Sequence, residues 1–144
     1  MQSPIDDIDR KIMKLLQHQA RMPISQISQM VAMSQPAVKE RIMKLEEKGF
    51  ITGYRTEFNL QRLERGTTSF ILMKTEQCQA LVDFCEQAPE VTDLHRISGE
   101  FNYLIKVKTA SVEELADFQD SIAGMGPSKS LISLKNLLEN RVVL

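Results

Sequence analysis

The chain has 144 residues, of which 42% are hydrophobic and 26% are charged, and its formal net charge is −1. This length provides one medium domain or two small ones, and the composition excludes a disordered chain. No apolar run approaches the roughly 18 residues that cross a bilayer, and the N-terminus lacks a secretory signal pattern, so we expect a cytoplasmic protein without a membrane partner.

The charges differ between the two parts of the chain. Residues 1–60 contain nine Lys and Arg against seven Asp and Glu, whereas the remainder contains nine against twelve. This asymmetry allows a basic face at one end and an acidic sensing or assembling part at the other.

The first part of the chain is predicted to begin with two short helices. Apolar residues at helical spacing indicate a helix over residues 4–17, with Ser3 as its cap and Pro4 in its first turn. After a polar link, Ser25 can cap a second helix that ends near Val31.

A third helix is predicted over residues 34–48 after a tight turn. Ser34 can cap it, Pro36 suits its first turn because the missing N–H has no partner there, and Gly49 is the expected residue after its end. Its inward stripe consists of Val38, Ile42 and Leu45.

The pattern changes at Phe50. The segment Phe50–Phe58 is rich in β-branched and aromatic residues and predicts a strand that leads out of the first domain. A polar stretch at 59–66 is the expected linker. We therefore predict a first domain at residues 1–59 and a second at 60–144.

The second domain is predicted to contain six elements in the order strand, helix, strand, strand, helix, strand. They are expected at residues 67–75, 77–88, 91–98, 102–109, 112–123 and 130–138. This βαββαβ order is that of the ferredoxin-like fold, in which two helices cover one face of a four-stranded antiparallel sheet. The predicted class is α+β, with an N-terminal three-helix winged helix-turn-helix domain and a C-terminal ferredoxin-like domain.

Local features of the second domain add three expectations. Ser111 with Glu114 predicts a capping box for the second helix. The strand Phe70–Met73 is apolar on both faces, so a second copy of the chain is expected to cover the open face of the sheet. Cys78 and Cys85 are interpreted mainly as small core residues of one helix, with a redox role as the lesser alternative.

Three stretches of the chain resemble the family of leucine-responsive and asparagine regulators (Lrp/AsnC). They are residues 8–12 (IDRKI), 34–51 (SQPAVKERIMKLEEKGFI) and 99–107 (GEFNYLIKV), and the second is the most specific. The resemblance covers nearly the whole chain. It implies a sequence-specific DNA-binding transcription regulator whose C-terminal domain forms dimers and higher assemblies, a tetramer or octamer, and binds a small effector, often an amino acid.

The third helix is the predicted reading element for double-stranded DNA. Such a helix enters the major groove with its N-terminal residues at base edges and basic side chains near phosphates, and Gln35 can pair with an adenine edge. Taken alone, the same pattern is also that of a solvated amphipathic helix. The predicted DNA-binding residues are Ser34, Gln35, Pro36, Lys39, Glu40, Arg41 and Lys44. Modest basic charge per monomer predicts cooperative binding of several sites by an assembly.

The resemblance places an effector site at the Gly99–Tyr103 turn, together with residues 128–130, the segment that precedes the last predicted strand. The turn joins the two central strands, and its glycine allows close approach of a ligand or a subunit, although it also suits a plain hairpin. Where the family usually has aspartate before the tyrosine, this chain has Asn102, so an amino-acid effector stays a hypothesis beside another effector or none. The predicted effector residues are Gly99, Glu100, Phe101, Asn102, Tyr103, Ser128 and Ser130.

An enzyme is not expected. His18 and His95 lie in different predicted domains without a nucleophile arrangement, and the sequence has no phosphate-binding glycine loop or clustered metal ligands, so no cofactor or metal is expected. Two alternatives remain beside the regulator. One is a stand-alone amino-acid-sensing module whose first domain contacts protein, and the other is a small ferredoxin-like enzyme that depends on His95.

Overall fold

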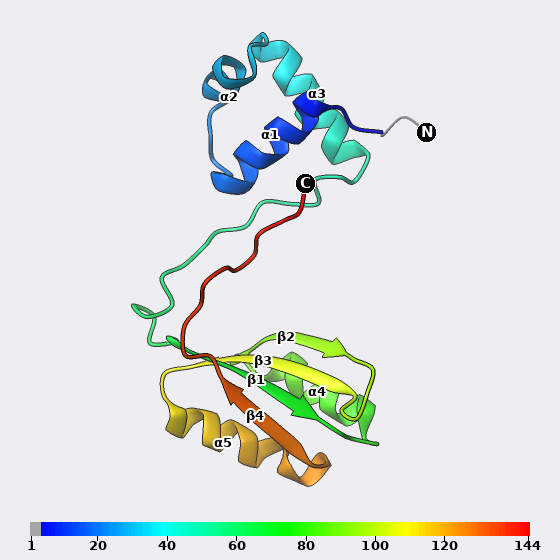
Figure 1. Ribbon diagram of the computed structural model, residues 1–144, viewed down its shortest axis with the longest axis vertical. Helices are drawn as coiled ribbons and strands as arrows, with labels where there is room; N and C mark the ends of the chain where they lie inside the picture. Colours follow the sequence, from blue (N-terminus) through cyan, green and yellow to red (C-terminus); the bar gives the residue numbers. More distant parts are fainter. Residues whose placement is uncertain (1–3) are drawn as a thin grey trace. The chain divides into compact units, whose positions relative to one another are not determined.

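The computed structural model describes residues 4–144 and divides into two compact units (Figure 1). The first contains the residues up to Glu57 together with Leu138–Leu144, and the second is Phe58–Leu137. The C-terminal residues therefore lie with the first unit, which the sequence did not indicate. No helix of the described residues is long and apolar enough to span a membrane.

The first unit consists of α1 (Asp7–His18), α2 (Ile24–Val31) and α3 (Gln35–Glu47). The three helices enclose a small core to which each contributes an apolar face. Its buried residues are Ile12, Met22, Ile27 and Val38, with Ile42 and others packed against them. The prediction of a three-helix helix-turn-helix domain is confirmed.

The helix starts differ in part from the predicted ones. α1 begins at Asp7 with Asp6 as its cap, not at Pro4, because the Asp6 carboxylate accepts the Asp9 N–H while the Asp9 carboxylate accepts the Asp6 N–H. The predicted cap, Ser3, lies outside the described residues. For α2 the prediction of Ser25 as cap is wrong, since the helix begins at Ile24 after the rigid extended Pro23.

The predicted ends of α3 are confirmed. The Ser34 hydroxyl oxygen accepts the Ala37 N–H at 3.3 Å, and Pro36 lies in the first turn. Gly49 follows the C-cap with a φ of +75°, a left-handed conformation that favours glycine.

The strand expected at Phe50–Phe58 is not formed within the chain. Residues 51–58, all of them described, have no regular secondary structure. The composition favours a strand, but a strand exists only where its backbone groups pair with a neighbour, and the described chain supplies none here. The wing of the predicted domain is therefore absent from the described residues of this single chain.

The second unit has the predicted βαββαβ order. Its elements are β1 (Thr67–Met73), α4 (Cys78–Gln87), β2 (Val91–Arg96), β3 (Tyr103–Thr109), α5 (Val112–Ile122), the short 3-10 helix η1 (Ala123–Met125) and β4 (Ser128–Ile132). The sheet order is β2-β3-β1-β4 with every pair antiparallel, and α4 and α5 cover one face (Figure 1). β2 is an edge strand. The Gly99–Tyr103 turn therefore joins an edge strand to a central strand, and the prediction that it joins two central strands is wrong.

The core of this unit lies between the sheet and the two helices. Ile71, Ile105 and Val107 of the sheet are fully buried against Leu81 of α4 and Ile122 of α5. Cys85 is buried and Cys78 packs against the same core, which confirms their interpretation as packing residues.

Only one of the two hydrogen bonds of the predicted Ser111–Glu114 capping box is present. The Ser111 hydroxyl accepts the Glu114 N–H, but the Glu114 carboxylate accepts the N–H of Ala110 and not that of Ser111. β4 starts at Ser128 and ends at Ile132, so the last strand begins and ends earlier than the predicted 130–138.

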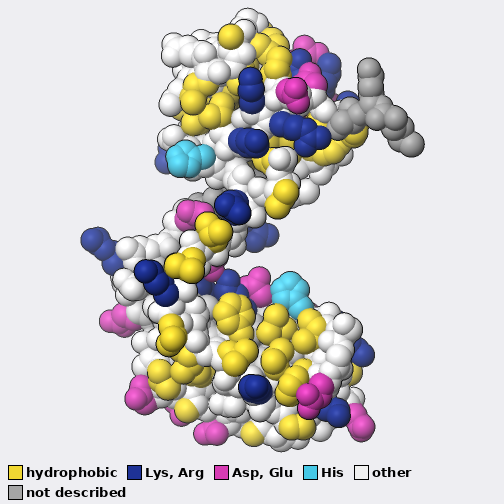
Figure 2. Space-filling view, in the orientation of Figure 1, with side chains coloured by type: hydrophobic (Ala, Val, Ile, Leu, Met, Phe, Trp, Pro, Cys, Tyr) yellow, Lys and Arg dark blue, Asp and Glu magenta, His cyan; other side chains and the backbone are white. Residues whose placement is uncertain are grey.

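The other face of the sheet is open and partly apolar. Phe70, Leu72 and Leu104 are half-buried there, and Leu131 is 45% exposed. Apolar side chains gather over the strands in the space-filling view (Figure 2). β1 is thus apolar on both faces, as its sequence indicates.

Candidate nucleic-acid interface and effector site

The predicted DNA-binding residues lie along the outer side of α3 and at its N-terminal cap. Ser34, Gln35 and Pro36 are exposed at the start of the helix, and Lys39, Glu40 and Lys44 are exposed along it. Together with Ile24 of α2, three of them line a groove, namely Gln35, Pro36 and Lys39. Six of the seven predicted residues are thus exposed: Gln35, Pro36 and Lys39 lie at one groove, whereas Glu40 and Lys44 line a second hollow beside Arg41.

The N-terminus of α3 is suited to a negatively charged ligand. Its first turn holds no acidic residue, and the helix dipole places partial positive charge at that end. Lys39 follows one turn later. A DNA phosphate near this end would therefore meet backbone N–H groups and a lysine in the same place.

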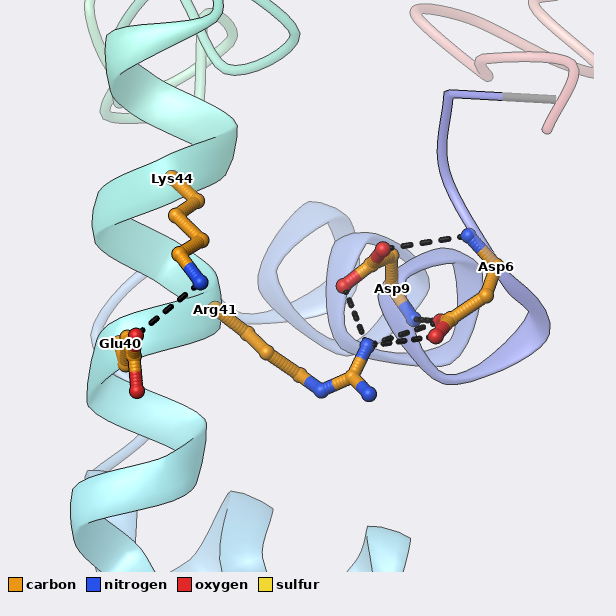
Figure 3. Close-up of polar contacts among 5 residues, drawn as sticks. All are labelled: Asp6, Asp9, Glu40, Arg41 and Lys44. Atoms are coloured by element: carbon orange, nitrogen blue, oxygen red, sulfur yellow. Dashed lines mark hydrogen bonds and ion pairs between the residues drawn. The ribbon is translucent and has the colours of Figure 1, made fainter.

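Glu40 and Lys44 form an ion pair on the exposed side of α3. The Lys44 Nζ lies 3.0 Å from the Glu40 Oε1 (Figure 3). Both side chains are exposed, so the pair contributes at most about 1 kcal/mol and can separate to meet a ligand. The ion pair also neutralises a carboxylate that would otherwise repel phosphate.

Arg41 differs from the other predicted residues because its side chain is used inside the unit. Its Nη1 lies 2.8 Å from the Asp6 Oδ2 and 2.9 Å from the Asp9 Oδ1, so the guanidinium joins α3 to the first turn of α1 (Figure 3). Hydrogen bonds from the Asp9 backbone and from Arg41 lower the pKa of Asp6. Hydrogen bonds to Asp6 and Asp9 in turn raise the pKa of Arg41. Sequence reasoning missed both aspartates as partners.

Most of the predicted effector residues gather at one end of the sheet. Met73 at the end of β1 pairs with Tyr103 of β3 on one side and with Ser128 of β4 on the other. The Asn102 N–H donates to the Met73 carbonyl at 2.9 Å. Gly99 has a φ of +105° in the adjoining turn, a conformation that an L side chain rarely adopts.

Asn102 holds this turn on the segment that follows β1. Its Oδ1 accepts the Thr75 N–H at 3.0 Å, and its Nδ2 donates to the Thr75 carbonyl at 2.8 Å. Both polar atoms of the amide are thereby used within the protein. The side-chain amide pairs with the Thr75 backbone as a peptide group of a neighbouring strand would, which requires one donor and one acceptor.

Thr75 and Gly126 complete this end of the sheet and were not found from the sequence. The Thr75 hydroxyl donates to the Met125 carbonyl at 2.6 Å and accepts the Gln77 N–H at 2.9 Å. A Cβ on Gly126 would lie 2.1 Å from the Lys74 carbonyl oxygen, so only glycine fits. The turn signal of Gly-x-Gly at 124–126 was visible in the sequence, but its contact partner was not.

Three predicted effector residues have internal positions. Tyr103 is buried, and its hydroxyl accepts a hydrogen bond from Arg96 at 3.3 Å, which raises the pKa of Arg96. The Ser128 hydroxyl accepts from Gln119 at 3.5 Å. Ser130 pairs with Ile71, farther from the turn, and its hydroxyl is buried without a hydrogen-bond partner in the described chain. The turn itself offers Gly99, exposed Glu100 and half-buried Phe101.

Both units match models of protein domains with assigned roles. Residues 5–46 match the AsnC-type helix-turn-helix domain, and residues 68–143 match the Lrp/AsnC ligand binding domain. This chain belongs to the Lrp/AsnC family.

Relatives of known name extend over nearly the whole of this Lrp/AsnC chain. An uncharacterized HTH-type transcriptional regulator of Bacillus subtilis, YezC, is 36% identical over 132 residues, which cover 92% of this chain and 95% of that protein. The HTH-type transcriptional regulator FL11 of Pyrococcus horikoshii is 30% identical, covering 94% and 93% of the two chains.

Solved structures share the Lrp/AsnC fold. Bacillus subtilis LrpC superposes with a TM-score of 0.87 at 20% identity, covering 96% of this chain and 100% of its own. A transcriptional regulator from Neisseria meningitidis, solved as a complex with L-methionine, has a TM-score of 0.87 at 22% identity and covers 94% and 93% of the two chains.

These findings establish the class of function. The protein is an Lrp/AsnC transcription regulator with a DNA-binding helix-turn-helix domain and a ligand-binding domain that modulates it. The alternative of a small enzyme is overturned, because the matching proteins are transcription regulators. In the structure, His95 is exposed on β2 and His18 is exposed at the end of α1. Within residues 4–144 no three His, Cys, Asp or Glu side chains are grouped to hold a metal ion.

Proposed function

We propose that this Lrp/AsnC protein binds a specific operator through α3 as a homo-oligomer, and that an amino acid bound by the second domain changes the assembly and hence the affinity for DNA. In this proposal residues 1–59 read DNA, whereas residues 60–144 assemble and sense the effector. The protein acts in the cytoplasm, where the chromosome of a bacterium or archaeon lies.

The observation that carries the DNA-binding proposal is the outer surface of α3. Its N-terminus is capped and free of acidic residues, and Gln35 and Lys39 line one groove beside it. Gln35 is suited to an adenine edge, and Lys39 and Lys44 are suited to phosphate or guanine. We assign Arg41 a positioning role, because its guanidinium joins α3 to Asp6 and Asp9.

Assembly is supported by two features that a single chain leaves incomplete. The open sheet face carries Phe70, Leu72, Leu104 and the exposed Leu131, and such apolar surface favours association. The extended residues 51–58 also have the composition of a strand without a partner in the described chain. A dimer, and from it a tetramer or octamer, would bind paired half-sites spaced by whole helical turns.

An amino-acid effector is supported by the ligand-binding domain and by the gathered turn at Gly99–Tyr103. Two neighbours in fold, from Neisseria meningitidis and from M. tuberculosis, were solved with L-methionine. Asn102 cannot supply the carboxylate that an amino group would face, and its amide is already used by Thr75. Glu100, exposed in the same turn, is the carboxylate left for that task.

Binding of fragmented genomic DNA at about physiological salt tests the first part. A specific regulator enriches a few sites roughly a thousandfold or more above non-specific fragments. Uniform, salt-sensitive retention of all fragments would indicate a packaging role, and no retention with or without amino acids would overturn the proposal.

Assembly and effector binding have separate tests. Leu131→Lys is expected to lower the oligomeric state in sedimentation, whereas Val112→Lys, an equally exposed apolar residue on α5, is expected to leave it unchanged. A thermal-shift screen of the twenty amino acids should reveal one or a few that raise the melting temperature, and Glu100→Gln should remove that shift. An oligomer unaffected by Leu131→Lys, or no shift by any amino acid, contradicts the corresponding part.

A further inference from the structure

Met43 is a large apolar side chain on the exposed, otherwise polar side of α3. It lies on α3 and is 49% exposed. The core side of α3 is formed by Val38, Ile42 and Leu45, which are buried or packed against the core. At 100° per residue, Met43 lies about 140° around the helix from Val38, so it points to the outer side.

Two of the polar neighbours of Met43 on α3 are bonded to other residues. Residues three or four positions away on a helix are its neighbours, and these include Glu40 and Glu46. Glu40 is joined to Lys44 at 3.0 Å, and Glu46 accepts a hydrogen bond from the Tyr54 hydroxyl at 3.4 Å. These two glutamates are therefore held by other partners, and Met43 stays 49% exposed.

A single exposed apolar residue is common on protein surfaces and by itself indicates nothing. Met43 is of interest because of its position relative to the predicted DNA-reading residues. It lies two turns after Gln35 and one turn after Lys39, about 12 Å along the helix axis from Gln35. Met43 lies about 40° around the helix from Lys39, so a helix that places Gln35 and Lys39 at base edges in the major groove turns Met43 toward the adjoining bases.

The major groove offers one apolar group, the C5 methyl of thymine. A methionine side chain is unbranched, flexible and polarizable, and it can cover a methyl group without a fixed hydrogen-bond geometry. We propose that Met43 contacts a thymine methyl and thereby sets a preference for thymine at one position of each half-site. This inference rests on the proposed reading of DNA by α3.

Replacement of thymine by deoxyuridine tests the contact, because it removes the methyl and leaves the base pair intact. The operator is first selected from random DNA with the parent protein. Each thymine is then replaced in turn, and one position per half-site should weaken binding about fourfold, the effect of exposing one methylene-sized group. The Met43→Ala variant should bind the thymine operator about fourfold more weakly and be indifferent at that position.

Two further variants separate this contact from a general effect on folding. Met43→Leu retains an apolar side chain and should keep most of the sensitivity to deoxyuridine. Met30→Ala removes a methionine that is 57% exposed on α2. This variant should keep the full sensitivity to deoxyuridine. The inference is overturned if the parent is indifferent to every deoxyuridine, or if Met43→Ala keeps the parent's sensitivity at the same position. If the parent selects no sequence at all, the proposed function fails and this inference with it.

Discussion

The side-chain amide of Asn102 lies against the backbone of Thr75 and makes two hydrogen bonds with it, accepting from the N–H at 3.0 Å and donating to the carbonyl at 2.8 Å. Asn102 is thereby the residue that fixes the turn after β2 to the segment after β1. The amide supplies a donor that a carboxylate at this position would lack.

Asn102→Asp should lower the free energy of unfolding by about 1–3 kcal/mol at neutral pH, because a carboxylate oxygen would face the Thr75 carbonyl. The loss should shrink as the pH falls toward about 4, because a protonated carboxyl regains a donor. Urea unfolding at both pH values measures this. Asn59→Asp is the matched control, since the Asn59 Oδ1 only accepts, from the Arg62 N–H. Equal stability losses in the two variants would contradict the role of the donor.

Gly126→Ala should destabilise the second unit by at least about 2 kcal/mol, because its new Cβ would collide with the Lys74 carbonyl and its φ of +147° disfavours an L side chain. Gly124→Ala, two residues earlier, meets nothing within 4 Å and should change stability by less than about 1 kcal/mol. Thermal unfolding of both variants checks the contrast. Similar melting temperatures would show that the segment can shift to accommodate the methyl group.

Acid should weaken the first unit through Asp6. Its pKa is lowered in the folded protein, chiefly by the Asp9 backbone and by Arg41, so its stabilising contribution is present above the ordinary value of 3.8 and is lost as the pH falls through the lowered pKa. Asp6→Asn should therefore show a flatter decline of the urea midpoint below about pH 5. Asp7→Asn, which is not a partner of Arg41, should decline like the parent. A parent-like curve for Asp6→Asn would contradict this assignment.

Lys44→Ala should weaken binding to every DNA sequence alike and reduce the dependence on log salt by about one unit. It also frees Glu40 from its ion pair, an effect that Glu40→Gln isolates. Lys135→Ala removes the same charge from the second unit and should leave the salt dependence unchanged. The affinity of each variant is measured between about 50 and 200 mM salt, where phosphate contacts weaken strongly, and the slopes against log salt are compared.

Gln35→Ala should instead relax the preference at one base position, by about 1–3 kcal/mol if the contact with adenine is bidentate. Repeated selection of operators from random DNA with this variant provides the measurement. If Gln35→Ala selects the same operator as the parent, and Lys44→Ala also binds like the parent, α3 is not the reading helix.

The features that could be predicted from the sequence are those decided by neighbouring residues. Ser34, Pro36 and Gly49 define the ends of α3 within a few positions of where each acts, and all three lie as expected. The order of the second unit followed from local periodicity in the same way. The start of α1 was misplaced because a serine followed by proline is a common start signal, whereas the cap is formed by Asp6 with Asp9.

The features that could not be predicted depend on residues far apart in the chain. Arg41 lies 35 residues from Asp6, and Asn102 lies 27 residues from Thr75, so no spacing rule connects them. The prediction of a strand at Phe50–Phe58 was wrong for a related reason. Its strand-forming composition requires a pairing partner, and the local sequence does not show whether one exists. Met43 was visible as a residue, but its exposure became evident only after the core side of α3 was known.

Thr75 joins its own segment, which leads into α4, to two loops that are distant in sequence. Its backbone holds the turn at Asn102, and its hydroxyl binds both the N-terminal end of α4 at Gln77 and the carbonyl of Met125. A displacement of Thr75 would break the bonds to all of these segments, so we expect their opening to be coupled in hydrogen exchange. A ligand that contacts the Gly99 turn alone would then also slow exchange at the Gln77 amide, and would in this way pass information about its presence to α4.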